Sequence, residues 1–138
     1  MNIKKALQPE CISLHLQSND REGVLQELVD LLAASGRVKD RQAVLKALQE
    51  RERRMSTGMQ HGLAIPHGKC DAVDSLVAAI GLKKEGIAFH ALDGQPSTIF
   101  VATIAPDNPA GPHIQFLAEI SRRLSDPAVR EQLLSAPT

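Results

Sequence analysis

Two apolar stretches, SLVAAIGL (residues 75–82) and STIFVATIA (residues 97–105), decide the fold class of this 138-residue chain. Continuous apolar runs of this length that are rich in valine and isoleucine are typical of β-strands covered on both faces. A shorter run, LAI (residues 63–65), is a further strand candidate. Between the two long runs, Asp93-Gly94 predicts a turn.

The sequence before these runs predicts one strand and two helices. Residues 11–17 alternate apolar and polar side chains, as a half-buried strand does. The inward positions of this strand would be Ile12, Leu14 and Leu16. Asp20 and Gly36 stand where the N-terminal and C-terminal caps of a helix belong. Asp40 opens a second helix, which ends in the charged run QERERRM (residues 49–55).

Two more helices are expected after the second apolar run. One follows His113, where apolar residues recur at helical spacing, and a short one starts at Asp126-Pro127. Helices and buried strands are therefore mixed along the chain, without an internal repeat. We expect a single layered α/β domain over residues 1–138, although the order of its strands is not readable.

Composition excludes several classes of protein. The 16 basic and 16 acidic residues give no net charge, and the chain has three phenylalanines with no tryptophan or tyrosine. Neither phosphate-backbone binding nor base stacking is favoured, so no nucleic-acid partner is expected. No signal peptide and no apolar run of about 18 residues is present, which predicts a cytoplasmic protein without membrane insertion. Cys11 and Cys70 are expected to be free thiols.

The stretch GLAIPHG (residues 62–68) singles out one of the five histidines. Pro66 fixes its own φ and favours an extended Ile65, while Gly68 removes a Cβ beside the imidazole. This frame predicts that His67 is lifted off the end of a strand, where another surface can approach it. The competing interpretation is an ordinary turn, and for His15, on the polar side of the first strand, a solvated side chain is expected.

Two other kinds of site are conceivable with the same residues. His61, His67, Cys70, His90 and His113 are all residue types that bind zinc, but their spacing matches no familiar zinc signature. A Cys70 nucleophile paired with His67 would need an oriented thiolate, for which no neighbouring residue provides a signal. We therefore expect no metal and no cofactor.

The segment RERRMSTGMQHGLAIPHG (residues 51–68) resembles the signature of the enzyme IIA domains of the fructose–mannitol type (type 2) of the bacterial phosphotransferase system (PTS). This family includes the nitrogen-regulatory enzyme IIA proteins. The resemblance extends through ECISLHLQ, GIAFHALDGQPSTIFVATIAP and HIQFLAEISRRLSDPAVREQLL. It implies a mixed β-sheet flanked by helices. Members commonly continue through a further C-terminal helical segment, whereas this chain stops at LLSAPT, so that segment is expected to be truncated.

The resemblance implies that His67 accepts a phosphoryl group on Nε2, with Arg51 and His113 beside it. Histidine suits this role because much of it is neutral, and hence nucleophilic, near pH 7. Its Nδ1–H should then donate a hydrogen bond, and a backbone carbonyl is a candidate acceptor. Arg51 would offer a planar fork to the phosphoryl oxygens. Three weaker supporting residues are Ser56, Thr57 and Gly68.

The resemblance also implies the partners. An HPr-type phosphocarrier protein would supply the phosphoryl group, and either a IIB protein or a regulatory target would respond to it. No fused IIB or membrane segment is present, which slightly favours the nitrogen-regulatory role over a sugar-transport subunit. A metal-binding module is the distant alternative.

Overall fold

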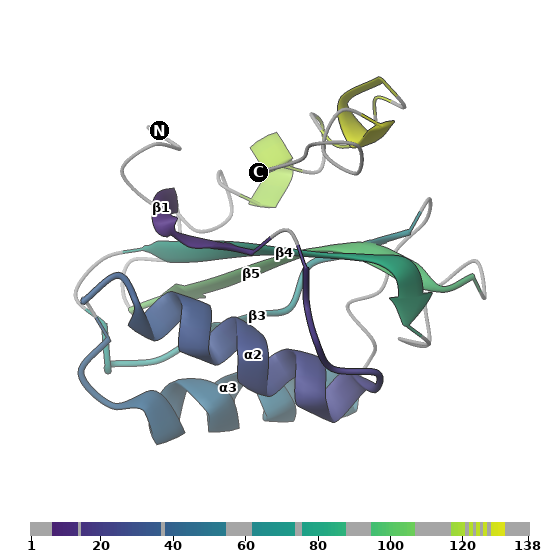
Figure 1. The fold of residues 1–138 in the computed structure, drawn as a ribbon. Helices are drawn as coiled ribbons and strands as arrows, with labels where there is room; N and C mark the ends of the chain where they lie inside the picture. Colours follow the sequence, from purple (N-terminus) through teal and green to yellow (C-terminus); the bar gives the residue numbers. More distant parts are fainter. Residues whose placement is uncertain are drawn as a thin grey trace.

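The computed structural model describes residues 7–13, 15–36, 38–54, 62–73, 76–87, 95–106, 117–120 and 128–131, with the single residues 122, 124 and 126. Within these residues, five strands form one sheet, and two helices lie against one of its faces (Figure 1). This arrangement confirms the predicted α/β class.

The sheet is mixed. Its strands are β1 (Leu7–Ser13), β2 (Leu63–Ala64), β3 (His67–Lys69), β4 (Val77–Ile87) and β5 (Ser97–Ala105). Their order is β1-β4-β5-β2, and β3 pairs with β5 beyond the end of β2. β4 and β5 are antiparallel, whereas the other pairs are parallel. The two long apolar runs thus become the two central strands, each with neighbours on both sides.

Two strand predictions need correction at their ends, and one strand was not predicted. β4 does not stop at Leu82, because residues 83–87 continue the strand and Ile87 pairs with Ser97 on β5. The run at 63–65 forms β2 over only its first two residues. β3 was not predicted at all, because its three residues carry no apolar pattern and are held by their ladder with β5.

β1 lies earlier in the sequence than predicted, and its inward side differs. The strand ends at Ser13, Cys11 is fully buried, and Ile12 is 41 % exposed. The reason is the pairing with β4: Ile12 is the partner of Ile80, on the face away from the helices, at an outer strand. Beyond the strand, Leu16 is buried as predicted and His15 is exposed as predicted.

The two helices begin at their predicted caps. In α2 (Arg21–Ala33), Oδ1 of Asp20 accepts a hydrogen bond from the amide of Gly23 at 2.7 Å. Gly36 follows the helix with φ of 77°, the left-handed conformation that glycine adopts readily. In α3 (Arg41–Arg54), Oδ1 of Asp40 accepts from the amides at positions 42 and 43.

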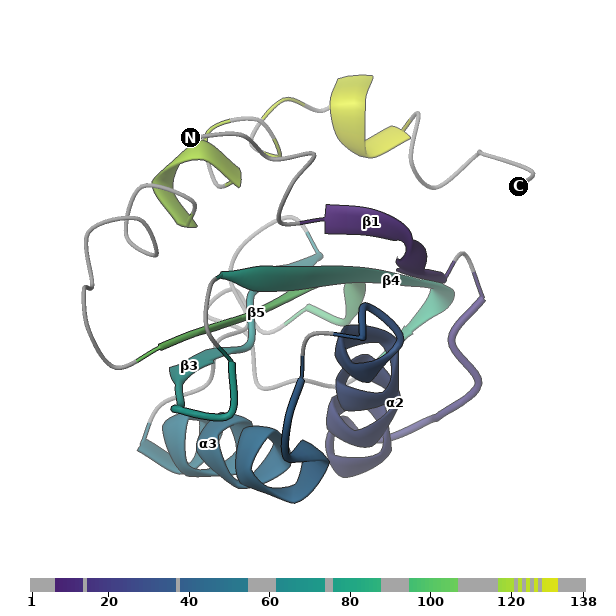
Figure 2. The ribbon, with the colours of Figure 1, turned by 90° about the vertical axis from the view of Figure 1, so that its left-hand side faces the viewer.

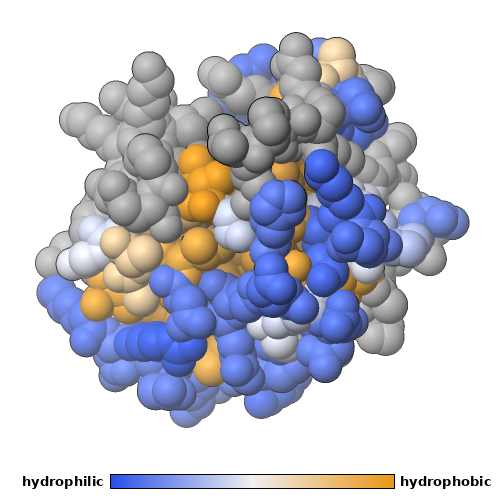
Figure 3. All heavy atoms as spheres, viewed as in Figure 1, coloured by the Kyte–Doolittle hydropathy of each residue, from blue (hydrophilic) through white to orange (hydrophobic). Residues whose placement is uncertain are grey.

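Each face of the sheet carries its own apolar cluster. Phe100, Ala102 and Ile104 of β5 face α2 and α3, whereas Ile99 and Val101 face the other side. There Ile120 and Leu124, from the late part of the chain, pack against the sheet. Figures 1 and 2 show that part on the face opposite to α2 and α3, and in Figure 3 the outer surface of the two helices is largely hydrophilic.

The late helical predictions are confirmed as far as the description reaches. Residues 117–120 are helical. Asp126 caps the next turn, because its Oδ1 accepts from the amide of Ala128 at 2.9 Å. The predicted Asp93-Gly94 turn lies outside the described residues.

Candidate functional site

His67 is positioned by the short strands β2 and β3 along β5. Gly62 turns the chain into β2 with φ of 77°, and its carbonyl accepts from the amides of Thr98 and Ile99 at 2.7 and 2.9 Å. After β2, the carbonyl of Pro66 accepts from the amide of Thr103 at 2.9 Å. Pro66 therefore interrupts the strand without costing a ladder bond, since only its carbonyl is needed there. The prediction that His67 lies beyond the end of a strand is wrong, because His67 is the first residue of β3.

Helix α3 lies against β3, as Figure 2 shows. A Cβ built on Gly68 would lie 3.4 Å from three atoms of Ala47. A Cβ there would be in ordinary contact with the helix, so the surface that approaches Gly68 is α3 of the same chain. One turn beyond Ala47, the helix carries Arg51.

The imidazole of His67 has a defined tautomer. Its Nδ1 lies 2.8 Å from the carbonyl oxygen of Ile65. A carbonyl oxygen only accepts hydrogen bonds, so Nδ1 carries the proton and Nε2 carries the lone pair. The structure thereby identifies the backbone carbonyl that the sequence could not specify.

The surroundings of His67 lower its pKa below the ordinary value. Burial of the half-buried ring is the largest cause, and the positive charge of Arg51 acts in the same direction. The hydrogen bond to Ile65 and the negative charge of Glu52 raise the pKa, but they do not outweigh the other two. The lowered pKa favours the neutral ring, in which Nε2 has a lone pair available.

The structure brings together two of the three main predicted site residues. Arg51, on α3, lies close enough for its charge to act on His67. His113, and the weaker candidates Ser56 and Thr57, lie outside the described residues. Gly68 follows His67 on β3 and contacts α3.

The burial of Glu52 was not predicted from the sequence. This residue is only 5 % exposed although it is charged. The signal was present: at helical spacing it follows Leu45 and Leu48, both buried, and so continues the apolar side of α3.

Two alternative sites were considered from the sequence, a metal site and a Cys70 nucleophile. Among the described residues, no group of three or more histidine, cysteine, aspartate or glutamate side chains lies together in an arrangement for a metal ion. His61 and His90 are outside that part of the chain. Cys11 and Cys70 are not in a disulfide, and the sulfur of Cys70 accepts from the amide of Ala72 at 3.4 Å.

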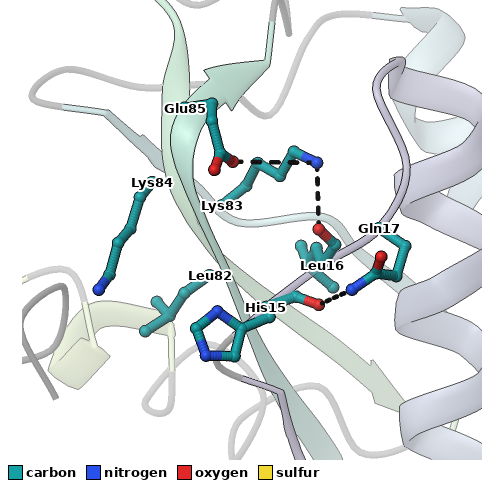
Figure 4. A pocket seen from close by; sticks show the side chains of 7 residues that line it. All are labelled: His15, Leu16, Gln17, Leu82, Lys83, Lys84 and Glu85. Atoms are coloured by element: carbon teal, nitrogen blue, oxygen red, sulfur yellow. Dashed lines mark hydrogen bonds and ion pairs between the residues drawn. The ribbon is translucent and has the colours of Figure 1, made fainter. Parts of the chain in front are cut away.

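A shallow hollow of about 180 Å³ opens elsewhere on the molecule, between the end of β1 and β4 (Figure 4). Lys83 crosses it, donating to the carbonyl of Leu16 at 3.1 Å and approaching Glu85 at 3.9 Å. Because β1 and β3 are on opposite sides of the β4–β5 pair, this hollow is not part of the His67 site.

Over the described residues, none of the helices combines the length and the apolar character needed to cross a bilayer.

A family model matches residues 5–138 of the chain. Its description is "Phosphoenolpyruvate-dependent sugar phosphotransferase system, EIIA 2".

Curated relatives include both transport and regulatory proteins. The chain is 41 % identical over 127 residues to the PTS system fructose-specific EIIA component of Haloferax volcanii, covering 92 % of this chain and 82 % of that protein. It is 32 % identical over 133 residues to the nitrogen regulatory protein of Bradyrhizobium diazoefficiens, covering 96 % and 86 %. It spans 21 % of the fructose-specific EIIABC component of Bacillus subtilis, to which it is 35 % identical over 136 residues, or 99 % of this chain.

Solved structures share the fold. The crystal structure of nitrogen regulatory protein IIA-Ntr from Neisseria meningitidis superimposes with a TM-score of 0.87 at 27 % identity, covering 99 % of this chain and 92 % of that one. The complex of enzyme IIA mannitol with phosphorylated enzyme IIB mannitol from Escherichia coli contains a chain that superimposes with a TM-score of 0.81 at 20 % identity, covering 96 % and 92 %.

Proposed function

The chain belongs to the EIIA 2 family of the phosphoenolpyruvate-dependent sugar phosphotransferase system, and on that premise we propose that Nε2 of His67 carries the phosphoryl group. The observation that carries this proposal is the hydrogen bond from Nδ1–H of His67 to the carbonyl of Ile65. It fixes the proton on Nδ1 and so directs the lone pair of Nε2 to the phosphorus atom. The lowered pKa keeps that lone pair available at neutral pH.

The proposed step is an exchange of one nitrogen–phosphorus bond for another. The lone pair of Nε2 forms a bond to phosphorus while the bond from phosphorus to the donor's histidine breaks, and the electron pair of that bond returns to the donor's ring. The unit that moves is PO₃⁻, and Nδ1 of His67 keeps its proton throughout. Because such transition states are loosely bonded, the protein contributes mainly position and charge.

Arg51 has the chemistry to hold the group in transit. Its guanidinium is a planar set of donors that matches two phosphoryl oxygens. Its charge already acts on His67 in the unphosphorylated site. We propose that His113, Ser56, Thr57 and the backbone at Gly68 complete the donors, as the resemblance implies.

The proposed partners follow from the family. An HPr-type phosphocarrier donates the group in the cytoplasm, and residues 5–138 receive it as one domain. The phosphoryl group on His67 could serve either of two functions. Transfer to a IIB protein for sugar uptake is supported by the higher identity to the fructose-specific relative, and a regulatory role is supported by the nitrogen regulatory relatives.

Phosphorylation of purified protein tests the proposal. Incubation with phosphoenolpyruvate, enzyme I and an HPr-type protein should give an acid-labile phosphoryl adduct, and peptide mapping should locate it on His67. His67→Ala should abolish labelling, whereas the matched control His15→Ala, at an exposed histidine beyond β1, should not. Undiminished labelling of His67→Ala would disprove the assignment. Chasing the labelled protein with a fructose-type IIB protein then separates the two uses, since only the transport role requires rapid loss of label.

A further inference from the structure

β2 and β3 lie along β5 in a single register. Before Pro66, Leu63 is the partner of Ile99. After it, His67 is the partner of Thr103. In both pairs the partner on β5 lies the same number of residues further along the chain, so the ladder is interrupted at Pro66 without being shifted. His67 therefore has a defined neighbour on β5, and that neighbour is Thr103.

Thr103 lies on the same face of the sheet as His67. Alternate residues of β5 face opposite sides, and Ile99 and Val101 belong to the cluster on the side away from α2 and α3. Thr103 is the next residue in this alternation. Its partner His67 projects from the same face, because registered residues of neighbouring strands point the same way. Adjacent strands are about 4.8 Å apart, so the two side chains are direct neighbours.

The backbone and the burial of Thr103 both connect it to His67. The amide of Thr103 donates to the carbonyl of Pro66 at 2.9 Å, and this carbonyl belongs to the peptide group that joins Pro66 to His67. Thr103 is 0 % exposed, whereas His67 is half-buried. Threonine is branched at Cβ, which makes its side chain stiff. β5 therefore places a rigid, buried side chain beside a ring that is partly open to other molecules.

The hydrogen bond of the His67 ring depends on the orientation of that ring. Nδ1 lies 2.8 Å from the carbonyl oxygen of Ile65, which is only two residues earlier in the chain. Rotation about the Cα–Cβ bond of His67 to another rotamer would break this contact. The proton would then no longer be held on Nδ1, because the hydrogen bond of one ring nitrogen sets the tautomer. Thr103 stands on the β5 side of the ring, where it limits such a rotation.

We propose, on the basis of the phosphoryl-carrier function above, that Thr103 is a positioning residue for His67. Its branched side chain backs the imidazole on the side of β5 and keeps Nδ1–H on the carbonyl of Ile65. Nε2 is thereby presented to the donor with its lone pair available. The role belongs to the shape of the branched side chain, so Thr103 acts through His67 and does not itself take part in the transfer.

Two variants of Thr103 test the role of its shape. Thr103→Val and Thr103→Ala both lack the hydroxyl, but only Thr103→Val keeps the branch at Cβ. Val77→Ala is the matched control, because it deletes two methyl groups from a fully buried strand residue on the opposite face of the sheet. Nitrogen NMR of the imidazole, at a pH where the ring is neutral, reports which nitrogen carries the proton. We expect a single Nδ1–H tautomer in the wild type, Thr103→Val and Val77→Ala, and a mixture of tautomers in Thr103→Ala.

The rate of phosphoryl transfer from an HPr-type donor is the second measurement. Thr103→Ala should slow the transfer by about 10–10²-fold, because a misplacement of about 1 Å can cost on the order of 10²-fold. Thr103→Val and Val77→Ala should transfer at close to the wild-type rate. Equal slowing in Thr103→Val and Thr103→Ala would show that the hydroxyl acts and not the branch, and would overturn the proposal.

The two measurements separate failure of this proposal from failure of the proposed function. If the wild-type chain takes up no phosphoryl group, the carrier function is wrong, while the tautomer of His67 still tests Thr103. A single Nδ1–H tautomer in Thr103→Ala, or its loss in Thr103→Val, would overturn the positioning role. Should either variant not fold, nuclear Overhauser effects in the wild type decide. We expect them between the side chain of Thr103 and the ring protons of His67, and their absence would equally overturn the role.

Discussion

The contact between Gly68 and α3 predicts how substitutions at this glycine will behave. An alanine Cβ would lie 3.4 Å from the backbone carbonyl carbon and oxygen and from the Cβ of Ala47, which is the limit of ordinary contact. Gly68→Ala should therefore change the free energy of unfolding by less than about 1 kcal/mol, since contact and backbone effects of that size oppose each other. Gly68→Val adds two methyl groups to a Cβ that is already in contact with the helix backbone. We expect a loss of about 1–3 kcal/mol, typical of overpacking.

The same substitution should affect the site. If valine displaces α3 from β3, His67 loses part of its burial and part of the influence of Arg51, both of which lower its pKa. Its pKa should then rise toward the ordinary value of about 6.5. Urea unfolding gives the stability, and NMR titration of the imidazole gives the pKa. Lys69→Val is the control, because it places the same side chain at the next, exposed position of β3. Wild-type stability together with an unchanged pKa in Gly68→Val would refute the packing of α3 on β3.

Two further predictions concern the charge state of the site. The pKa of His67 is lower in the folded chain than in the unfolded chain. Between these two pKa values the unfolded chain binds more protons than the folded chain. The free energy of unfolding should therefore decrease as the pH falls below about 6.5. His67→Gln should make that decrease smaller, and an equal decrease in urea titrations of both proteins would contradict the assignment. Arg51→Lys keeps the charge but loses the planar fork, and should slow phosphoryl transfer by about 10²–10³ with the circular dichroism spectrum unchanged. A wild-type rate in rapid-quench kinetics would make Arg51 a mere surface charge.

Sequence alone predicts the elements whose physical cause is local. The caps Asp20 and Asp40 locate both helices because each side chain bonds to amides of its own first turn. The run of residues 97–105 gives β5 with its bounds, since a strand buried on both faces leaves a continuous apolar signal.

The elements that the sequence did not predict are stabilised by pairing with residues that are distant in the sequence. β3 exists because its three residues pair with β5, and the extension of β4 past Leu82 carries charged residues that resemble a loop. The site divides in the same way. His67 is singled out by its neighbours Pro66 and Gly68, whereas the closeness of Arg51 to it depends on how α3 packs against β3.

The mixed pairing of the sheet also implies an order of assembly. β4 and β5 are antiparallel and joined by residues 88–96, so they can pair after closing a short loop. β3 pairs with β5 in parallel, and all of β4 lies between these two strands in the sequence, so their pairing closes a longer loop, which is slower and more costly. The strand that carries His67 should thus dock after the β4–β5 pair has formed and detach before that pair opens. Amide hydrogen exchange should show protection of residues 67–69 failing well before that of the central strands, so the reactive segment would be the one that yields locally while the rest of the sheet stays intact.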